Sequence, residues 1–229
     1  MTITPTNLTR AAGVAAAAAG PIFIGVQFNH PHLDVTSITT TEVIIRSSLK
    51  ALMAVLALVG ITGMYLSQVR RNGLPGLIGY AMLAGGYLLI MSTTLVAASV
   101  LLQIAGTSPA FVTDAIAIST GGTATGDLGL MQYLSKAQDL GYLLGGLIFG
   151  IALYRAHVLA RWASALLAVG GVITIALSVM PDAFYRLLAL PNGIAMIGLG
   201  YSLWSTARPS QDPQAAPVSS RPVATAHAA

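Results

Sequence analysis

Two histidines and an aspartate alternate in one short stretch, His30-Pro31-His32-Leu33-Asp34. Alternate residues of an extended segment point to the same face, and Pro31 favours extended backbone before it. Imidazole and carboxylate are ligands for zinc and similar ions, so His30, His32 and Asp34 are candidate metal ligands. A polar loop that caps the protein is the preferred interpretation, a proton-sensitive contact is another, and we predict no cofactor.

Three charged residues, Glu42, Arg46 and Lys50, follow at intervals of four. Residues four apart share one helix face, and Glu before Arg is the favourable order for an ion pair. Thr39 followed by Glu42 three residues later fits a capping box, so Thr39 is the expected N-cap. Lys50 then lies about 12 Å along the helix axis from Glu42, near the hydrocarbon boundary. Snorkelling of the Lys50 side chain to lipid headgroups is the preferred interpretation, and a cation at the bottom of an external vestibule is the alternative.

A second polar group, Gln132, Lys136 and Asp139, also has helical spacing. We expect Lys136 and Asp139 either to line the same vestibule or to form an ion pair at the membrane interface. Gln103 lies near the external end of another apolar stretch, where its amide needs a neighbouring helix or water as a partner. The candidate binding residues are therefore Glu42, Arg46, Lys50, Gln103, Lys136 and Asp139.

The composition identifies the class of protein that has to position these side chains. Of 229 residues, 55% are hydrophobic and 8% are charged, whereas a soluble domain carries about 25% charged residues. This composition excludes a soluble enzyme, a disordered chain and a nucleic-acid binder, and it indicates an integral membrane protein. The chain has no cysteine, so disulfides and thiolate chemistry are excluded.

Six apolar stretches near the length of a membrane-spanning helix predict an all-α, integral membrane helical bundle in one domain, residues 1–204. The expected spans are 11–28, 48–68, 77–105, 133–154, 160–180 and 186–204. The first is the weakest, and a cleaved signal over residues 1–20 is its alternative. Residues 205–229 are rich in Pro and Ala and are predicted to form a disordered cytoplasmic tail.

The distribution of charge gives the expected orientation. With six spans, seven basic residues and one acidic residue lie on the side of the termini, and four basic and six acidic residues lie on the other side. Basic residues in short loops stay in the cytoplasm, so both termini are predicted to be cytoplasmic.

The expected span 133–154 also carries two overlapping motifs of small residues. Gly141 and Gly145 form one, and Gly146 and Gly150 form the other. Such motifs let the backbone of another helix approach closely. We therefore expect this helix at the centre of the bundle.

Three segments of the C-terminal half carry a resemblance to a known group of proteins. They are Tyr154–Ala163, Leu166–Gly171 and Gly198–Trp204. Together they resemble the closing pattern of uncharacterised multi-span membrane proteins of actinobacteria and related bacteria, and the first half is loosely similar to the same proteins. The resemblance implies a bacterial inner-membrane location and a helical bundle, and it carries no activity.

Three functions are compatible with these residues. A binding or sensing protein whose vestibule accepts a lipid or small amphiphile is preferred, with membrane lipid as its partner and no nucleic acid. A membrane enzyme acting on an isoprenoid or lipid would use Glu42, Asp139 or the His30, His32 and Asp34 group as acid, base or ligands. A transporter is third, because it requires a continuous polar path through the helices.

Overall fold

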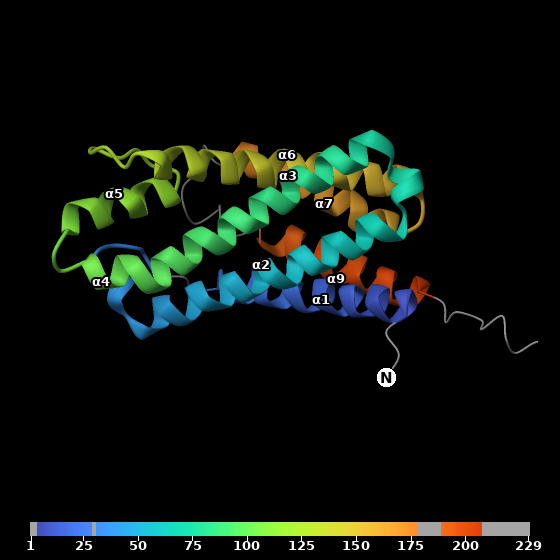
Figure 1. Cartoon of the computed structure of the whole chain (residues 1–229), viewed down its shortest axis with the longest axis horizontal. Coiled ribbons are helices and arrows are strands. Elements are labelled where there is room, and N and C mark those ends of the chain that lie inside the picture. The colour runs from blue at the N-terminus through green and yellow to red at the C-terminus, as the bar shows by residue number, and fades with distance from the viewer. Residues whose placement is uncertain (1–3, 29–30, 178–188, 208–229) are drawn as a thin grey trace, which may run out of the picture.

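The protein is all-helical over the residues that its computed structural model describes, which are 4–28, 31–177 and 189–207, and these ranges contain no strand. These ranges contain six long helices and four short elements (Figure 1). The long helices are α1 Pro5–Gly25, α2 Thr41–Ser67, α3 Val69–Val96, α6 Leu130–Ala156, α7 Arg161–Leu177 and α9 Ala189–Thr206. The short elements are the 3-10 helix η1 Ser37–Thr39, the π-helix η2 Ala97–Leu101, α4 Leu102–Ile104 and α5 Pro109–Ser119.

The six long helices form a closed ring. Each of them packs against the next one in the chain order α1, α2, α3, α6, α7 and α9, and α9 returns to α1. In Figure 1, α3, α6 and α7 form one layer, and α1, α2 and α9 form the other.

The expectation that the helix around residue 145 lies at the centre of the bundle is wrong, because α6 is one member of the ring. Its two faces of small residues contact two different neighbouring helices. A Cβ atom added at Gly145 would meet the Leu83 backbone of α3, and one added at Gly150 would lie 2.6 Å from the Ala168 backbone nitrogen of α7. The glycines therefore hold α6 between these two helices.

The ring has two different ends. One end, called here the loop end, carries the starts of α2 and α6 together with η1, η2, α4 and α5. The other, called the turn end, carries the start of α1, the end of α9, the α2–α3 turn at Gln68 and the α6–α7 turn at residues 157–160.

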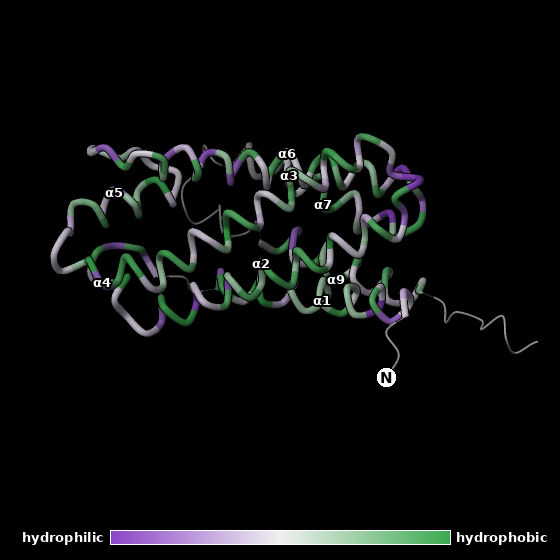
Figure 2. The backbone as a smooth tube through the Cα atoms, viewed as in Figure 1, coloured by the Kyte–Doolittle hydropathy of each residue, from purple (hydrophilic) through white to green (hydrophobic). Residues whose placement is uncertain are grey.

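The outer surface of the ring is suited to lipid. Among the described residues, four segments are long and apolar enough to cross a membrane: Pro5–Gly25, Thr41–Ser67, Val69–Ile104 and Leu130–Ala156. Figure 2 shows hydrophobic residues along the length of the helices and hydrophilic ones gathered at the ends. Large apolar side chains such as Val55, Leu88 and Ile151 are exposed on this surface. Lipid tails cover such side chains at little cost, so the protein is a membrane protein.

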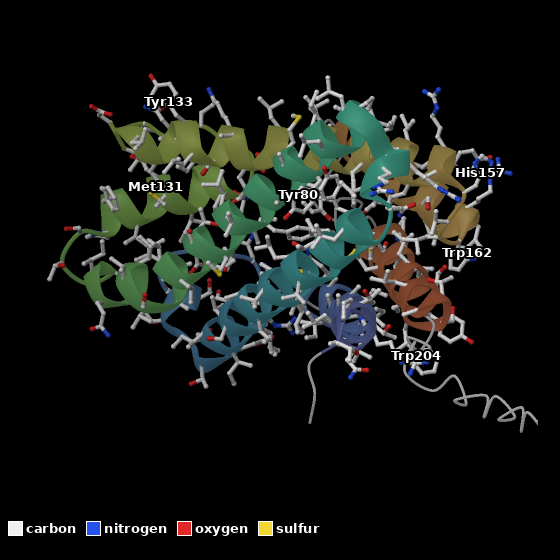
Figure 3. All side chains as sticks on the ribbon, turned by 45° about the vertical axis from the view of Figure 1, so that its right-hand side comes forward. Tyr80, Met131, Tyr133, His157, Trp162 and Trp204 are labelled. Atoms are coloured by element: carbon white, nitrogen blue, oxygen red, sulfur yellow. The ribbon has the colours of Figure 1, made fainter. Side chains whose placement is uncertain are left out.

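Exposed aromatic and basic side chains gather at the turn end. Trp162 and Trp204 lie there (Figure 3). The Arg161 guanidinium lies 4.3 Å from the Tyr154 ring centre and donates a hydrogen bond of 2.7 Å to its hydroxyl, and Arg10 lies 5.8 Å from the ring centre of Trp204. Tyr and Trp favour the boundary between lipid tails and water, and the turn end carries the side chains typical of such a boundary.

Each expected span coincides with a long helix, although the bounds differ. The helix α2 begins at Thr41, seven residues before the expected span. The bounds of α3 include Val69, but the backbone at Gly73 is not helical (φ 57°), so the long part of α3 starts only after Gly73, close to the expected span. The N-cap of α2 is Thr40, whose Oγ1 accepts from the Val43 N–H at 3.5 Å, so the expected N-cap Thr39 is wrong by one residue. Thr39 ends η1 instead. The expected disordered tail lies almost wholly outside the described residues.

Candidate functional site

A cavity of about 280 Å³ lies between the helices in the half of the ring that faces the loop end. Side chains of α1, α2, α3, α6 and α9 line it, and α5 contributes Ser119. Its walls are mixed. Met53, Ile90 and Leu143 are apolar, whereas other positions carry amides, hydroxyls and charges. A concave site with apolar walls and a few polar groups is the usual form of a small-molecule site.

Lys50 of α2 and Asp139 of α6 bring opposite charges into this cavity. Both were candidates for one vestibule, and the fold brings them together although α3 separates their helices in the ring. Lys50 is 15 residues from Tyr65, and Asp139 is 15 residues from Tyr154, both at the turn end. At 1.5 Å per residue this is about 22 Å, which is less than the roughly 30 Å of the hydrocarbon core. The two charges therefore lie at a similar height in the ring, toward its loop end.

Three amides that line the cavity were missed by sequence reasoning. Gln27 lines it just after α1, Gln138 lines it from α6, and Asn192, which is 4% exposed, lines it from α9. The Thr93 hydroxyl of α3 donates a hydrogen bond of 2.8 Å to Gln138 Oε1, which joins α3 to α6 at the cavity wall. None of these amides belongs to a helical spacing pattern of polar residues that was singled out in the sequence, so no such pattern pointed to them.

Aromatic rings form another part of the wall. Phe23 of α1 and Tyr142 of α6 both line the cavity, with ring centres 6.4 Å apart and planes 11° from parallel. The buried Tyr87 meets Tyr142 edge-on, with ring centres 5.5 Å apart. This contact orients the Tyr142 ring from behind.

Glu42 and Arg46 have a different role from the one predicted. They form the expected ion pair, with Arg46 Nη2 2.8 Å from Glu42 Oε1. Arg46 Nη1 also donates hydrogen bonds to the carbonyls of Val26 at 3.1 Å and Phe28 at 2.9 Å, which follow the end of α1. A cation stabilises the carbonyl end of a helix. Neither side chain lines the cavity with Lys50; the two residues fasten α1 to α2.

Gln103 and Lys136 are exposed and do not line the cavity. The π-helix η2 immediately precedes Gln103 on the same continuous helix, and the extra residue of a π-turn rotates everything after it by about 100°. Such a change cannot be read from an α-helical spacing. The Lys136 ammonium is not within 4.0 Å of the Asp139 carboxylate, so the predicted ion pair between them does not form.

The predicted metal ligands are only partly described. His30 lies outside the described residues, and His32 is exposed. Asp34 caps η1, because its Oδ1 accepts from the N–H groups of Ser37 at 2.6 Å and Thr36 at 2.8 Å. These two bonds, the Ser37 one first, hold the pKa of the Asp34 carboxyl below its usual value. Within residues 4–28, 31–177 and 189–207, no three His, Cys, Asp or Glu side chains gather as a metal site would require.

Asp114 of α5 organises the segment that leads into α6. Its carboxylate accepts hydrogen bonds of 2.9 Å from the N–H groups of Thr125 and Gly126. These bonds, the Thr125 one first, lower the pKa of the Asp114 carboxyl. Because Ser119 of the same helix lines the cavity, this carboxylate helps to hold the cavity's outer cover in place.

Two buried amides occupy the opposite half of the ring. Gln68 and Asn72 are each 4% exposed at the turn end, and Gln68 Oε1 and both polar side-chain atoms of Asn72 have no protein hydrogen-bond partner. Leu83 and Phe149, which are completely buried, lie between these amides and the level of the cavity. The two polar regions are therefore separated by packed apolar side chains.

Comparison of the chain with protein-family models, curated proteins and solved structures found no match, so the cavity has to be interpreted from its own geometry.

Proposed function

We propose that the protein binds a small amphiphile, or the head of a lipid, in the cavity at the loop end. The observation that carries this proposal is the meeting of Lys50 and Asp139, from two helices that are not neighbours, in one cavity whose remaining wall is part apolar and part hydrogen-bonding. Charged groups at membrane depth are costly, and they are usually retained for function.

The proposed orientation places this cavity on the external side. We propose six spans in a bacterial inner membrane, with both termini in the cytoplasm. In support, Arg10, Arg155 and Arg161 all belong to the turn end, as do the exposed Trp162 and Trp204. The packing of α1 against α2 and α9 supports its assignment as the first span. A reporter that is active only in the periplasm, fused after Arg208, should be inactive; activity there would contradict this topology.

Native mass spectrometry of the protein purified in a mild detergent tests the binding function. The wild-type protein should retain a copurified amphiphile, and Lys50→Ala and Asp139→Ala should each lose most of it. Lys136→Ala is the matched control, because Lys136 is an exposed charge on α6 outside the cavity. Equal retention in all four proteins, or no bound molecule in the wild type, would contradict the proposal.

The membrane-enzyme alternative is less well supported by the geometry. It requires several carboxylates or imidazoles within about 5 Å of one another. In the described part of the chain these groups are committed elsewhere: Asp34 caps η1, Asp114 holds the loop before α6, and Glu42 pairs with Arg46. Asp139 is the carboxylate that lines the cavity.

A further inference from the structure

We infer that the cavity recognises a zwitterionic amphiphile, with the ligand's ammonium group at Asp139 and its anionic group toward Lys50. This inference rests on the proposed binding function and names the class of ligand.

The charges of the cavity wall favour a ligand that carries both signs of charge. Among the described residues that line it, Lys50 supplies one positive charge and Asp139 one negative charge. A purely anionic ligand would be placed beside the Asp139 carboxylate, and a purely cationic ligand beside the Lys50 ammonium. Like charges repel strongly where lipid and protein replace water. A ligand with both signs of charge and no net charge matches the wall.

Asp139 is the better-defined half of this pair. Within the described ranges, no nitrogen of Lys, Arg or His lies within 4.0 Å of its carboxylate. Its position, about 22 Å from Tyr154 along α6, places it inside the thickness of the hydrocarbon core. The exposed Asp139 carboxylate has a hydrogen-bond partner in the Gln138 side chain. At that depth it also requires a countercharge, which an ammonium group supplies.

The aromatic wall lies beside this carboxylate. Tyr142 follows Asp139 by three residues, so the two side chains occupy one face of α6, and both line the cavity. Phe23 extends the aromatic wall from α1, with its ring nearly parallel to that of Tyr142. Aromatic faces attract ammonium groups, and together with a carboxylate they form the kind of surface that binds substituted ammonium ions.

The size of the cavity limits the bound part to a headgroup and the start of its chain. At about 280 Å³ it is slightly smaller than the cavities of about 300–1,000 Å³ that enclose drug-sized ligands. The apolar side chains of Met53, Ile90 and Leu143 provide contacts for the first carbons of the chain. The rest of the chain has to extend out of the cavity.

Headgroup discrimination by the wild-type protein tests the inference without any variant. Four probes with twelve-carbon chains would be titrated below micelle formation onto the protein in neutral nanodiscs: lysophosphatidylethanolamine, lysophosphatidylglycerol, dodecyltrimethylammonium and monolaurin. Binding would be measured by native mass spectrometry. The zwitterionic lysophosphatidylethanolamine should bind at least tenfold more tightly than the anionic, cationic and neutral probes. Equal or tighter binding of any other probe would overturn the inference, whereas the absence of saturable binding by all four would overturn the proposed function itself.

Two variants test which residue distinguishes between the headgroups. Asp139→Asn should lower the affinity for the zwitterionic probe at least tenfold. The anionic probe should then bind more tightly than the zwitterionic one, because Lys50 remains. Lys136→Gln, the matched exposed control on the same helix, should leave all four affinities within twofold. Unchanged discrimination in a folded Asp139→Asn protein would overturn the assignment of the ammonium site.

Discussion

Replacement of Gly86 by alanine is predicted to destabilise the ring, because α3 and α6 approach most closely through glycines. A Cβ atom at Gly86 would lie 2.7 Å from the Tyr142 backbone nitrogen and 2.9 Å from its Cα. Ordinary contact begins near 3.4 Å, so the helices would have to separate by about 0.7 Å at the floor of the cavity. Overpacking of this kind costs about 1–3 kcal/mol.

The neighbouring Gly85 provides the matched control, since a Cβ atom there meets nothing within 4 Å. Both substitutions gain the same intrinsic helix preference of alanine, so the difference between them isolates the packing cost. For a chain of this length, 1 kcal/mol shifts the melting temperature by roughly 2–4 °C. Gly86→Ala should therefore melt about 2–12 °C below Gly85→Ala in a fluorescence melt of the purified protein in detergent. Equal melting temperatures would refute the close approach of α3 and α6 at this point.

Two further predictions concern the polar groups that hold the loop end together. Arg46→Ala should lower the free energy of unfolding by about 1–3 kcal/mol in denaturant titration, because charged hydrogen bonds to the α1 carbonyls are lost with the ion pair. Glu42→Gln should cost less than 1 kcal/mol, because Glu42 is 53% exposed; an equal loss in both variants would contradict this division of roles. The pKa of the Asp114 carboxyl is lowered in the folded chain. Its contribution to the stability of the fold is therefore present above the ordinary pKa of 3.8 and is lost as the pH falls through the folded-state pKa. The protection factors of the Thr125 and Gly126 amides, which are exchange rates corrected for the intrinsic effect of pH, should therefore fall on acidification in the wild type, and they should already be low near neutral pH in Asp114→Asn.

The positions of the helices could be predicted from the sequence because membrane thickness fixes the length of an apolar stretch. The Glu42–Arg46 ion pair could be predicted for a similar reason, since a spacing of four residues is a local property of one helix. Lys50 and Asp139 were candidates for one vestibule because of the helix ends that carry them, although snorkelling and an interfacial ion pair were preferred, and the ring brings both into the cavity.

The other features of the cavity and of the loop end depend on how the helices pack against one another, and the sequence did not predict them. Gln138 and Asn192 meet in the cavity only because the ring closes in the order that it does, which no spacing within one helix encodes. The partners of Arg46 at the end of α1 are 18 and 20 residues away across a loop. Gln103 follows a π-turn, which changes its direction from the one that α-helical spacing predicts.

The central claim is that an amphiphile occupies the cavity, and photo-crosslinking tests it most directly. A lysophosphatidylethanolamine with a diazirine close to its headgroup would be added to the protein in nanodiscs, irradiated, and located by peptide mass spectrometry. Labels should concentrate on the cavity residues Met53, Ile90 and Leu143, and they should decrease in Asp139→Asn. Labels confined to lipid-facing side chains such as Val55 and Leu88 would contradict the claim.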